Sequence, residues 1–103
     1  MAPLVEYVFE WDPQKAAENL QKHGIAFRNT QPIFADPGAL TLFDVGHSQK
    51  EERWITMGLD ALGNLAVACH TFEPSGPNKV TIRLISVRKA NSAEARQYRR
   101  EKR

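Results

Sequence analysis

The sequence predicts an α+β fold: one small domain in which an antiparallel sheet carries two N-terminal helices and one C-terminal helix. Three observations predict it. The length of 103 residues fits one domain. Helix signals near both ends of the chain enclose a succession of strand patterns, as in α+β domains. No apolar run approaches the roughly 20 residues that a membrane-spanning helix needs. We therefore expect a single domain over residues 1–103, with the element order β-α-α-β-β-β-β-α.

The first strand and the first helix have clear local signals. Residues 5–11 alternate large apolar side chains with polar or smaller ones, the pattern of a strand with one buried face. Asp12 and Pro13 follow as an N-cap residue and a first-turn residue, and Gly24 is a natural residue just past a helix end. We therefore expect a helix between Asp12 and Gly24.

A second, short helix is expected over residues 29–35, with Pro32 in its first turn, where the missing N–H costs little. Apolar runs separated by turn residues then predict strands at 39–43, 51–59, 65–72 and 80–88, with a hairpin loop at 60–64 and an exposed turn at 73–78. Asn91 and Ser92 offer N-cap oxygens for the last helix, residues 93–103.

The charge of the chain is unevenly distributed. Residues 79–103 contain nine Lys/Arg against two Asp/Glu, a balance of +7, while the other 78 residues contain five against ten, a balance of −5. A basic quarter on an acidic body fits a polyanionic partner such as nucleic acid. The alternative for the helix alone is a solvated, basic helix end. Arg83 and Arg88 are different, because a charge in an apolar strand is costly to bury unless it is paired or binds a ligand.

Several classes of site are absent from the sequence. No glycine-rich nucleotide loop and no G-x-S-x-G motif occurs, and the histidines lack the spacing of metal ligands. We expect no metal and no cofactor. The single cysteine, Cys69, lies in an apolar run and is expected as a buried thiol. The lone cysteine and the lack of a signal-peptide pattern at the N-terminus lead us to expect a cytoplasmic protein.

Histidines, carboxylates and cations remain as the chemically active side chains. Metal-free RNA cleavage needs a base for the 2′-OH, an acid for the 5′-oxygen, and cations for the charge on the phosphorus oxygens. The candidate catalytic residues are His47, Glu52, His70, Arg83, Arg88 and Lys89. Arginines and Lys89 would hold the phosphate, and His47 or His70 with Glu52 would handle protons. The candidate RNA-binding residues are Arg53, Arg96, Arg99 and Arg100.

Each candidate also has a structural interpretation. His47 fits a solvated loop histidine, His70 fits a hydrogen-bonded core histidine, and Glu52 and Arg53 fit ordinary surface ion pairs, which stabilise little. Trp54, next to Ile55 in an apolar strand, is expected in the core rather than as a platform for stacking bases.

Several stretches together resemble the BrnT-type toxins over about residues 6–98. They are Phe9-Glu-Trp-Asp-Pro13, Lys22-His-Gly24, His47-Ser48, Glu51-Glu-Arg-Trp-Ile-Thr-Met-Gly58, His70-Thr71, Arg83-Leu-Ile-Ser-Val-Arg-Lys-Ala90 and Glu94-Ala-Arg-Gln-Tyr98. Each piece is weak alone, and their common order and spacing make the resemblance specific. Pro32 and the segment from Pro74 to Pro77 depart from the family pattern without touching the charged positions.

The resemblance implies a compact fold related to the RelE-type ribonuclease toxins and cleavage of RNA that arrests translation. It also implies a BrnA-like antitoxin with a ribbon-helix-helix domain, which neutralises the toxin, contacts operator DNA and represses the operon with it. No membrane is implied. We expect the antitoxin to cover the basic surface, including Arg83 and Arg88. The alternative function is a non-catalytic module that binds nucleic acid or the antitoxin.

Overall fold

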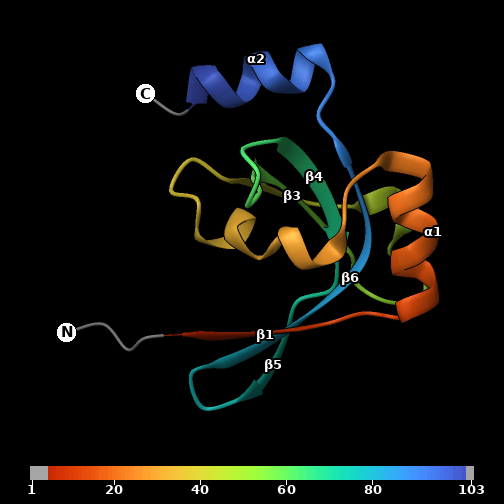
Figure 1. The fold of residues 1–103 in the computed structure, drawn as a ribbon. Coiled ribbons are helices and arrows are strands. Elements are labelled where there is room, and N and C mark those ends of the chain that lie inside the picture. Colours follow the sequence, from red (N-terminus) through yellow and green to blue (C-terminus); the bar gives the residue numbers. More distant parts are fainter. Residues whose placement is uncertain (1–4, 102–103) are drawn as a thin grey trace.

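The computed structural model describes residues 5–101 of the chain (Figure 1). The strands are β1 (Glu6–Glu10), β2 (Leu40–Phe43), β3 (Trp54–Leu59), β4 (Leu65–His70), β5 (Glu73–Gly76) and β6 (Lys79–Lys89). The α-helices are α1 (Pro13–His23) and α2 (Ser92–Glu101), and the 3₁₀ segments are η1 (Phe27–Asn29), η2 (Gln31–Ala35) and η3 (Val45–His47). The α+β class is confirmed.

The sheet is mixed, which corrects the expected antiparallel sheet. Its strands follow the order β1-β6-β4-β3-β2. The short strand β5 lies off this path and pairs with β6. β1 runs parallel to β6, with Glu6 opposite Lys79 and Glu10 opposite Arg83, while the other pairs are antiparallel. A parallel pair needs a long connection, and here nearly the whole chain lies between its two strands. Periodicity within a strand contains no information about that pairing.

One face of the sheet forms the main core. Ile82, Leu84 and Val87 of β6 and Ala66 and Ala68 of β4 are at most 2% exposed. The α1 helix and the two 3₁₀ segments η1 and η2 cover this face, as Figure 1 shows for the orange segments in front of and beside the sheet. The opposite face carries α2 at one end.

The signals at the ends of α1 are confirmed. The Asp12 carboxylate accepts hydrogen bonds from the backbone N–H groups of Gln14 and Lys15 at 2.8 and 3.4 Å. Gly24 ends the helix at φ 72°, in the left-handed region that favours glycine. The buried Asn19 then fastens α1 to β6: its side chain accepts from the N–H of Val87 at 3.0 Å and donates to the carbonyl of Val87 at 2.9 Å.

The expected second helix is instead two consecutive 3₁₀ segments, η1 and η2. Pro32 lies in the first turn of η2, as expected. The hydrogen bonds run three residues back, for example from the N–H of Thr30 to the carbonyl of Phe27 at 3.0 Å. Phe27 and Ile33 are both buried by this arrangement. The segment stays irregular because its large apolar side chains are spaced to reach the sheet rather than to fill one side of an α-helix.

Two strand boundaries differ from the sequence expectation by at least two residues, and one strand was not expected. β3 begins at Trp54 rather than at residue 51, so Glu51 lies in the preceding loop. β4 ends at His70 rather than at residue 72. The exposed turn expected over residues 73–78 contains the short strand β5, because β6 extends past the end of β4 and leaves free backbone for pairing.

A register shift determines where the side chains of β6 point. Cys69 pairs with Ser86 while His70 pairs with Leu84, so Ile85 is an extra residue on β6. Side chains alternate along a strand, and the extra residue reverses the alternation. Arg83 and Arg88 therefore both lie on the face away from α1, although they are an odd number of residues apart.

The α2 helix begins with a capping box. Asn91 accepts from the N–H of Glu94 at 2.8 Å, and Glu94 accepts from the N–H of Asn91 at 2.9 Å. Tyr98 is the buried anchor of this helix, packed against Met57 and Val67. No helix over residues 5–101 is long and apolar enough to cross a membrane. Trp54 is half-buried beside the Phe43 ring, so its expected full burial is met only in part.

Candidate active site

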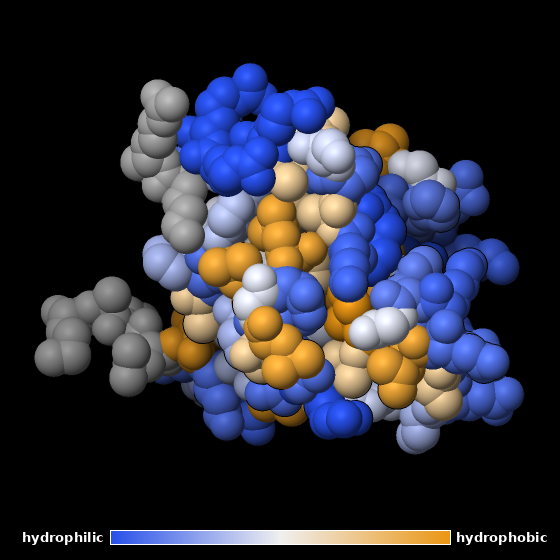
Figure 2. Space-filling view, turned by 45° about the horizontal axis from the view of Figure 1, so that its top comes forward, coloured by the Kyte–Doolittle hydropathy of each residue, from blue (hydrophilic) through white to orange (hydrophobic). Residues whose placement is uncertain are grey.

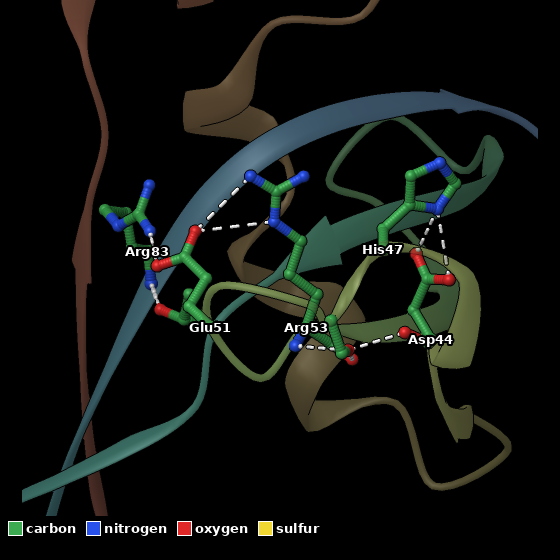
Figure 3. Close-up of polar contacts among 7 residues, drawn as sticks. Asp44, His47, Glu51, Arg53 and Arg83 are labelled. Atoms are coloured by element: carbon green, nitrogen blue, oxygen red, sulfur yellow. Dashed lines mark hydrogen bonds and ion pairs between the residues drawn. The ribbon is translucent and has the colours of Figure 1, made fainter.

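Glu51 connects two arginines that are distant in the sequence. One of its carboxylate oxygens accepts from the Arg83 guanidinium at 2.6 Å, and the other accepts from Arg53 at 3.3 and 3.4 Å. Figure 3 shows Glu51 between the two guanidinium groups, with Arg83 on β6 and Arg53 just before β3. Two planar donor groups thus converge on one anion, the geometry that also binds phosphate.

The electrostatics of this cluster keep Glu51 ionised. The hydrogen bond from Arg83 lowers the pKa of the Glu51 carboxyl below 4.5, partial burial opposes this shift, and Arg53 adds to it. One carboxylate therefore faces two cations, and the cluster as a whole keeps a positive charge. Such a residual charge favours a second anion at the same place.

His47 and Asp44 form a second pair next to this cluster. The His47 Nδ1 lies 3.0 Å from one Asp44 carboxylate oxygen and 3.2 Å from the other. Asp44 is 12% exposed while His47 is 72% exposed. The loop is held by Ser48, whose hydroxyl donates to the Asp44 carbonyl and accepts from the N–H of Arg53 at 3.0 Å. A carboxylate on Nδ1 directs Nε2 outward as the nitrogen that can exchange a proton with a substrate.

His47, Glu51 and Arg53 line one cavity of about 190 Å³, while their partners Asp44 and Arg83 lie behind them, outside its lining. The full lining is Gly46, His47, Gln49, Lys50, Glu51 and Arg53. Figure 3 shows the Arg53 side chain between Glu51 and the His47 ring, with its guanidinium on the same side as that ring. The arrangement places a histidine, an oriented carboxylate and several cations around one polar space, as metal-free phosphodiester cleavage requires.

His70 lies in the core and not at this cavity. It is 2% exposed, its Nε2 is 2.7 Å from the Thr56 hydroxyl, and its Nδ1 is 2.8 Å from the Thr71 carbonyl. The Phe34 ring meets it edge-on at 4.8 Å. Burial lowers the pKa of His70, against the opposing effect of the Thr71 carbonyl. The structure therefore matches the structural interpretation of His70, because both ring nitrogens are occupied and water cannot reach them.

Arg88 and Lys89 are also not brought to the cavity. Arg88 donates two hydrogen bonds to the Glu94 carboxylate, at 2.8 and 2.9 Å, and thereby ties β6 to the start of α2. This pairing raises the pKa of Arg88 and lowers that of Glu94. Five strand residues span about 16 Å, so Arg88 lies far along β6 from Arg83. Lys89 is exposed and lies opposite Ala66 in the register of β4 and β6. Its side chain is on the other face of the sheet from that of Arg88.

The remaining candidates lie on the surface. Glu52 is exposed in the loop before β3, and Arg96, Arg99 and Arg100 are exposed on α2. Figure 2 shows α2 as a strongly hydrophilic surface at the top of the molecule. The basic quarter of the sequence is thus divided in space. Arg83 belongs to the cavity cluster, Arg88 is neutralised by Glu94, and the α2 arginines form a separate basic surface.

The sequence reasoning missed Asp44 and the role of Glu51. Asp44 stands three residues before His47, a spacing at which side chains in one helical turn meet, and this was the available signal. No local signal links Glu51 to Arg83, because 32 residues separate them. Within residues 5–101, no three His, Cys, Asp or Glu side chains gather as a potential metal-binding group. Cys69 is half-buried, and burial raises the pKa of its thiol.

Comparison with known proteins gives a matching family and a related solved structure. The model of a family described as the ribonuclease toxin BrnT of type II toxin-antitoxin systems matches residues 11–94. A crystal structure of the Brucella abortus ribonuclease toxin BrnT is similar with a TM-score of 0.59 at 22% sequence identity. The similarity covers 85% of this chain and 100% of that chain, and at this identity it shows a shared fold. No curated protein matches the sequence.

Proposed function

The chain belongs to the BrnT family of ribonuclease toxins of type II toxin-antitoxin systems, and from this premise we propose that it is a metal-independent endoribonuclease. The observation that supports the chemistry is the cavity lined by His47, Glu51 and Arg53, with Asp44 bound to His47 and Arg83 bound to Glu51. In this proposal the arginines bind the scissile phosphate and His47 transfers protons. Arg53 takes the place that the sequence suggested for Arg88.

The reaction is an internal transfer at phosphorus. The 2′-oxygen attacks the phosphorus atom as its proton passes to a base, and the bond from phosphorus to the 5′-oxygen breaks as that oxygen receives a proton from an acid. Arg53 and Arg83 neutralise the charge that grows on the non-bridging oxygens. The His47 Nε2 serves as one of the two proton carriers, and the exposed Glu52 is the candidate for the other. The products carry a 2′,3′-cyclic phosphate and a free 5′-hydroxyl.

The biological setting follows from the same family. A type II toxin has a protein antitoxin as its partner. We propose a BrnA-like antitoxin with a ribbon-helix-helix domain, through which the pair contacts operator DNA and represses its own operon. Free toxin would cut cellular RNA and arrest translation in the cytoplasm.

The decisive experiment is single-turnover cleavage of RNA by antitoxin-free protein in EDTA. Arg83→Ala and His47→Ala should each slow the reaction by about 10²–10⁴-fold, the usual contribution of an oxyanion-type donor or a proton carrier. Arg99→Ala is the matched control, because it removes an exposed arginine of α2 and should leave the single-turnover rate almost unchanged.

Three results would contradict the proposal. A chemical step that needs a divalent ion would remove metal independence. Full activity in both Arg83→Ala and His47→Ala, with normal circular dichroism, would place the active site elsewhere. Retained RNA binding without any cleavage by the unsubstituted protein would favour the alternative function, a non-catalytic binding module.

A further inference from the structure

A second cavity lies between α2 and the sheet face that α1 does not cover. It has a volume of about 310 Å³, and its floor is apolar and formed by Leu40, Leu42, Ile55, Met57 and Val67. Leu42 on the edge strand β2 is 66% exposed. We call this cavity the α2 groove. It contains none of the residues proposed for catalysis, so its exposed apolar surface has no purpose in the cleavage reaction.

The rim of the α2 groove is acidic although α2 is a basic helix. Glu94, Gln97 and Glu101 line the groove, and their spacing of three and four residues places them on one side of the helix. Arg96, Arg99 and Arg100 fall on the other sides and are exposed. Because Glu94 is paired with Arg88, the negative charge on the groove side of the helix comes from Glu101, whereas the α2 arginines are exposed to solvent. This separation of charge cannot be seen in the net charge of the segment.

The chemistry of the groove selects among possible occupants. RNA is disfavoured, because the described residues that line the groove include no lysine or arginine to bind phosphate, and Glu101 would repel it. A second copy of this chain is disfavoured too, because its other exposed large apolar residues are spread over separate elements and loops and form no single amphipathic segment. They are Val5, Tyr7, Leu20, Phe43, Val45, Leu62 and Phe72. An apolar segment that also carries lysine or arginine satisfies both the floor and the rim.

We propose that the α2 groove is the docking site of the antitoxin, which inserts an amphipathic segment with large apolar side chains and at least one basic residue. The inference rests on the proposed toxin function for the identity of the partner and on the groove for its chemistry. It places the first antitoxin contact away from the basic surface that the sequence analysis expected the antitoxin to cover. In this arrangement the antitoxin binds first between α2 and the sheet. The part of the antitoxin that extends along β2 and β3 then covers the cavity at His47.

The test is titration of the purified toxin with its cognate antitoxin by calorimetry. Leu42→Asp should weaken the complex by at least about ten-fold, as expected for an apolar anchor. The matched control is Leu62→Asp in the β3–β4 loop. Leu62 is 73% exposed and lies outside the groove, so its variant should bind within about two-fold of the unsubstituted protein. Glu101→Lys should weaken binding, whereas Arg99→Glu should not.

Each other result overturns the proposal. Leu42→Asp binding as tightly as the unsubstituted toxin would exclude the groove, and equal losses in Leu42→Asp and Leu62→Asp would indicate general destabilisation. A toxin dimer that Leu42→Asp dissociates would assign the groove to a second copy, and a loss of RNA affinity alone would assign it to RNA. The titration needs no cleavage. Failure of the nuclease proposal would therefore appear as inactive protein that still binds antitoxin through the groove.

Discussion

At the scale of single residues, the candidate site depends on partners rather than on residue types. His47 and His70 are the same side chain, yet one is an exposed ring held at Nδ1 by Asp44 and the other is sealed in the core by Thr56 and Thr71. Arg83 and Arg88 differ in the same way: the Glu51 carboxylate binds both Arg83 and Arg53, whereas the Glu94 carboxylate binds Arg88 with both of its oxygens. Exposure and partner therefore decide which of each pair can meet a substrate.

Asp44 should act through His47. Asp44→Asn removes the charge that supports the protonated ring during proton transfer, so the single-turnover rate should fall, by less than the approximately 10²–10⁴-fold loss in His47→Ala. Because the two residues work as one unit, Asp44→Asn combined with His47→Ala should be no slower than His47→Ala alone. Losses that multiply in the double variant would show that Asp44 does not act through His47.

At the scale of elements, α2 is held by few contacts. Tyr98 is its buried side chain, and the Tyr98 hydroxyl donates to the Asp36 carboxylate at 2.6 Å. The same Asp36 oxygen accepts from the N–H of Leu59 at 3.0 Å, so one carboxylate joins α2, the end of η2 and β3. Arg88 and Glu94 fasten the start of the helix. These contacts keep the α2 groove in shape.

The Tyr98 contact predicts a loss of stability at high pH. Burial first, and then the Asp36 carboxylate, raise the pKa of Tyr98 from 10.0 to about 12. A raised folded-state pKa means that the stabilisation is complete below pH 10 and disappears as the pH rises through about 12. Urea denaturation should show this decline for the unsubstituted protein.

Tyr98→Phe separates this contact from other alkaline effects. It should cost about 1.5–3 kcal/mol at neutral pH, the range for a hydrogen bond to a charged group. It should also flatten the decline between pH 10 and 12. A variant with the same pH dependence as the unsubstituted protein would show that another group causes it.

At the scale of the whole molecule, two distinct faces follow from the charge distribution. The cavity near His47 and the outer side of α2 are basic, whereas the groove side of α2 is acidic. RNA and the antitoxin then have different surfaces available to them. Long RNA should reach from the cavity to the arginines of α2, if its path follows the basic surfaces.

Salt dependence measures this path. Each phosphate contact to single-stranded RNA contributes about 0.7 to the slope of log K against log salt concentration. Arg99→Ala should reduce that slope by about this amount and weaken binding modestly. Lys15→Ala on the exposed part of α1 is the control and should leave the slope unchanged. A slope that Arg99→Ala leaves unaltered would remove α2 from the RNA path.

The sequence by itself determined the family and most of the elements, but not the 3₁₀ character of residues 27–35 or the strand β5. The ends of α1 were predictable because an N-cap and a C′ glycine act on backbone groups a few residues away. The strands were predictable because alternation reports burial, and the ordered motifs indicated the BrnT family. The proposed class of chemistry rests on the combination of histidine, carboxylate and arginine.

Only the tertiary structure decided which of these groups meet. The parallel pairing of β1 with β6, the extra residue Ile85 in β6 and the bridge from Glu51 to Arg83 depend on register between segments that are distant in the sequence. So does the orientation of α2, which turns Glu101 to the groove and Arg99 to solvent. Local sequence patterns report whether a residue is buried and which residues are near it along the chain. A binding site is formed by contacts across the sheet, and these contacts exist only when the whole chain is packed.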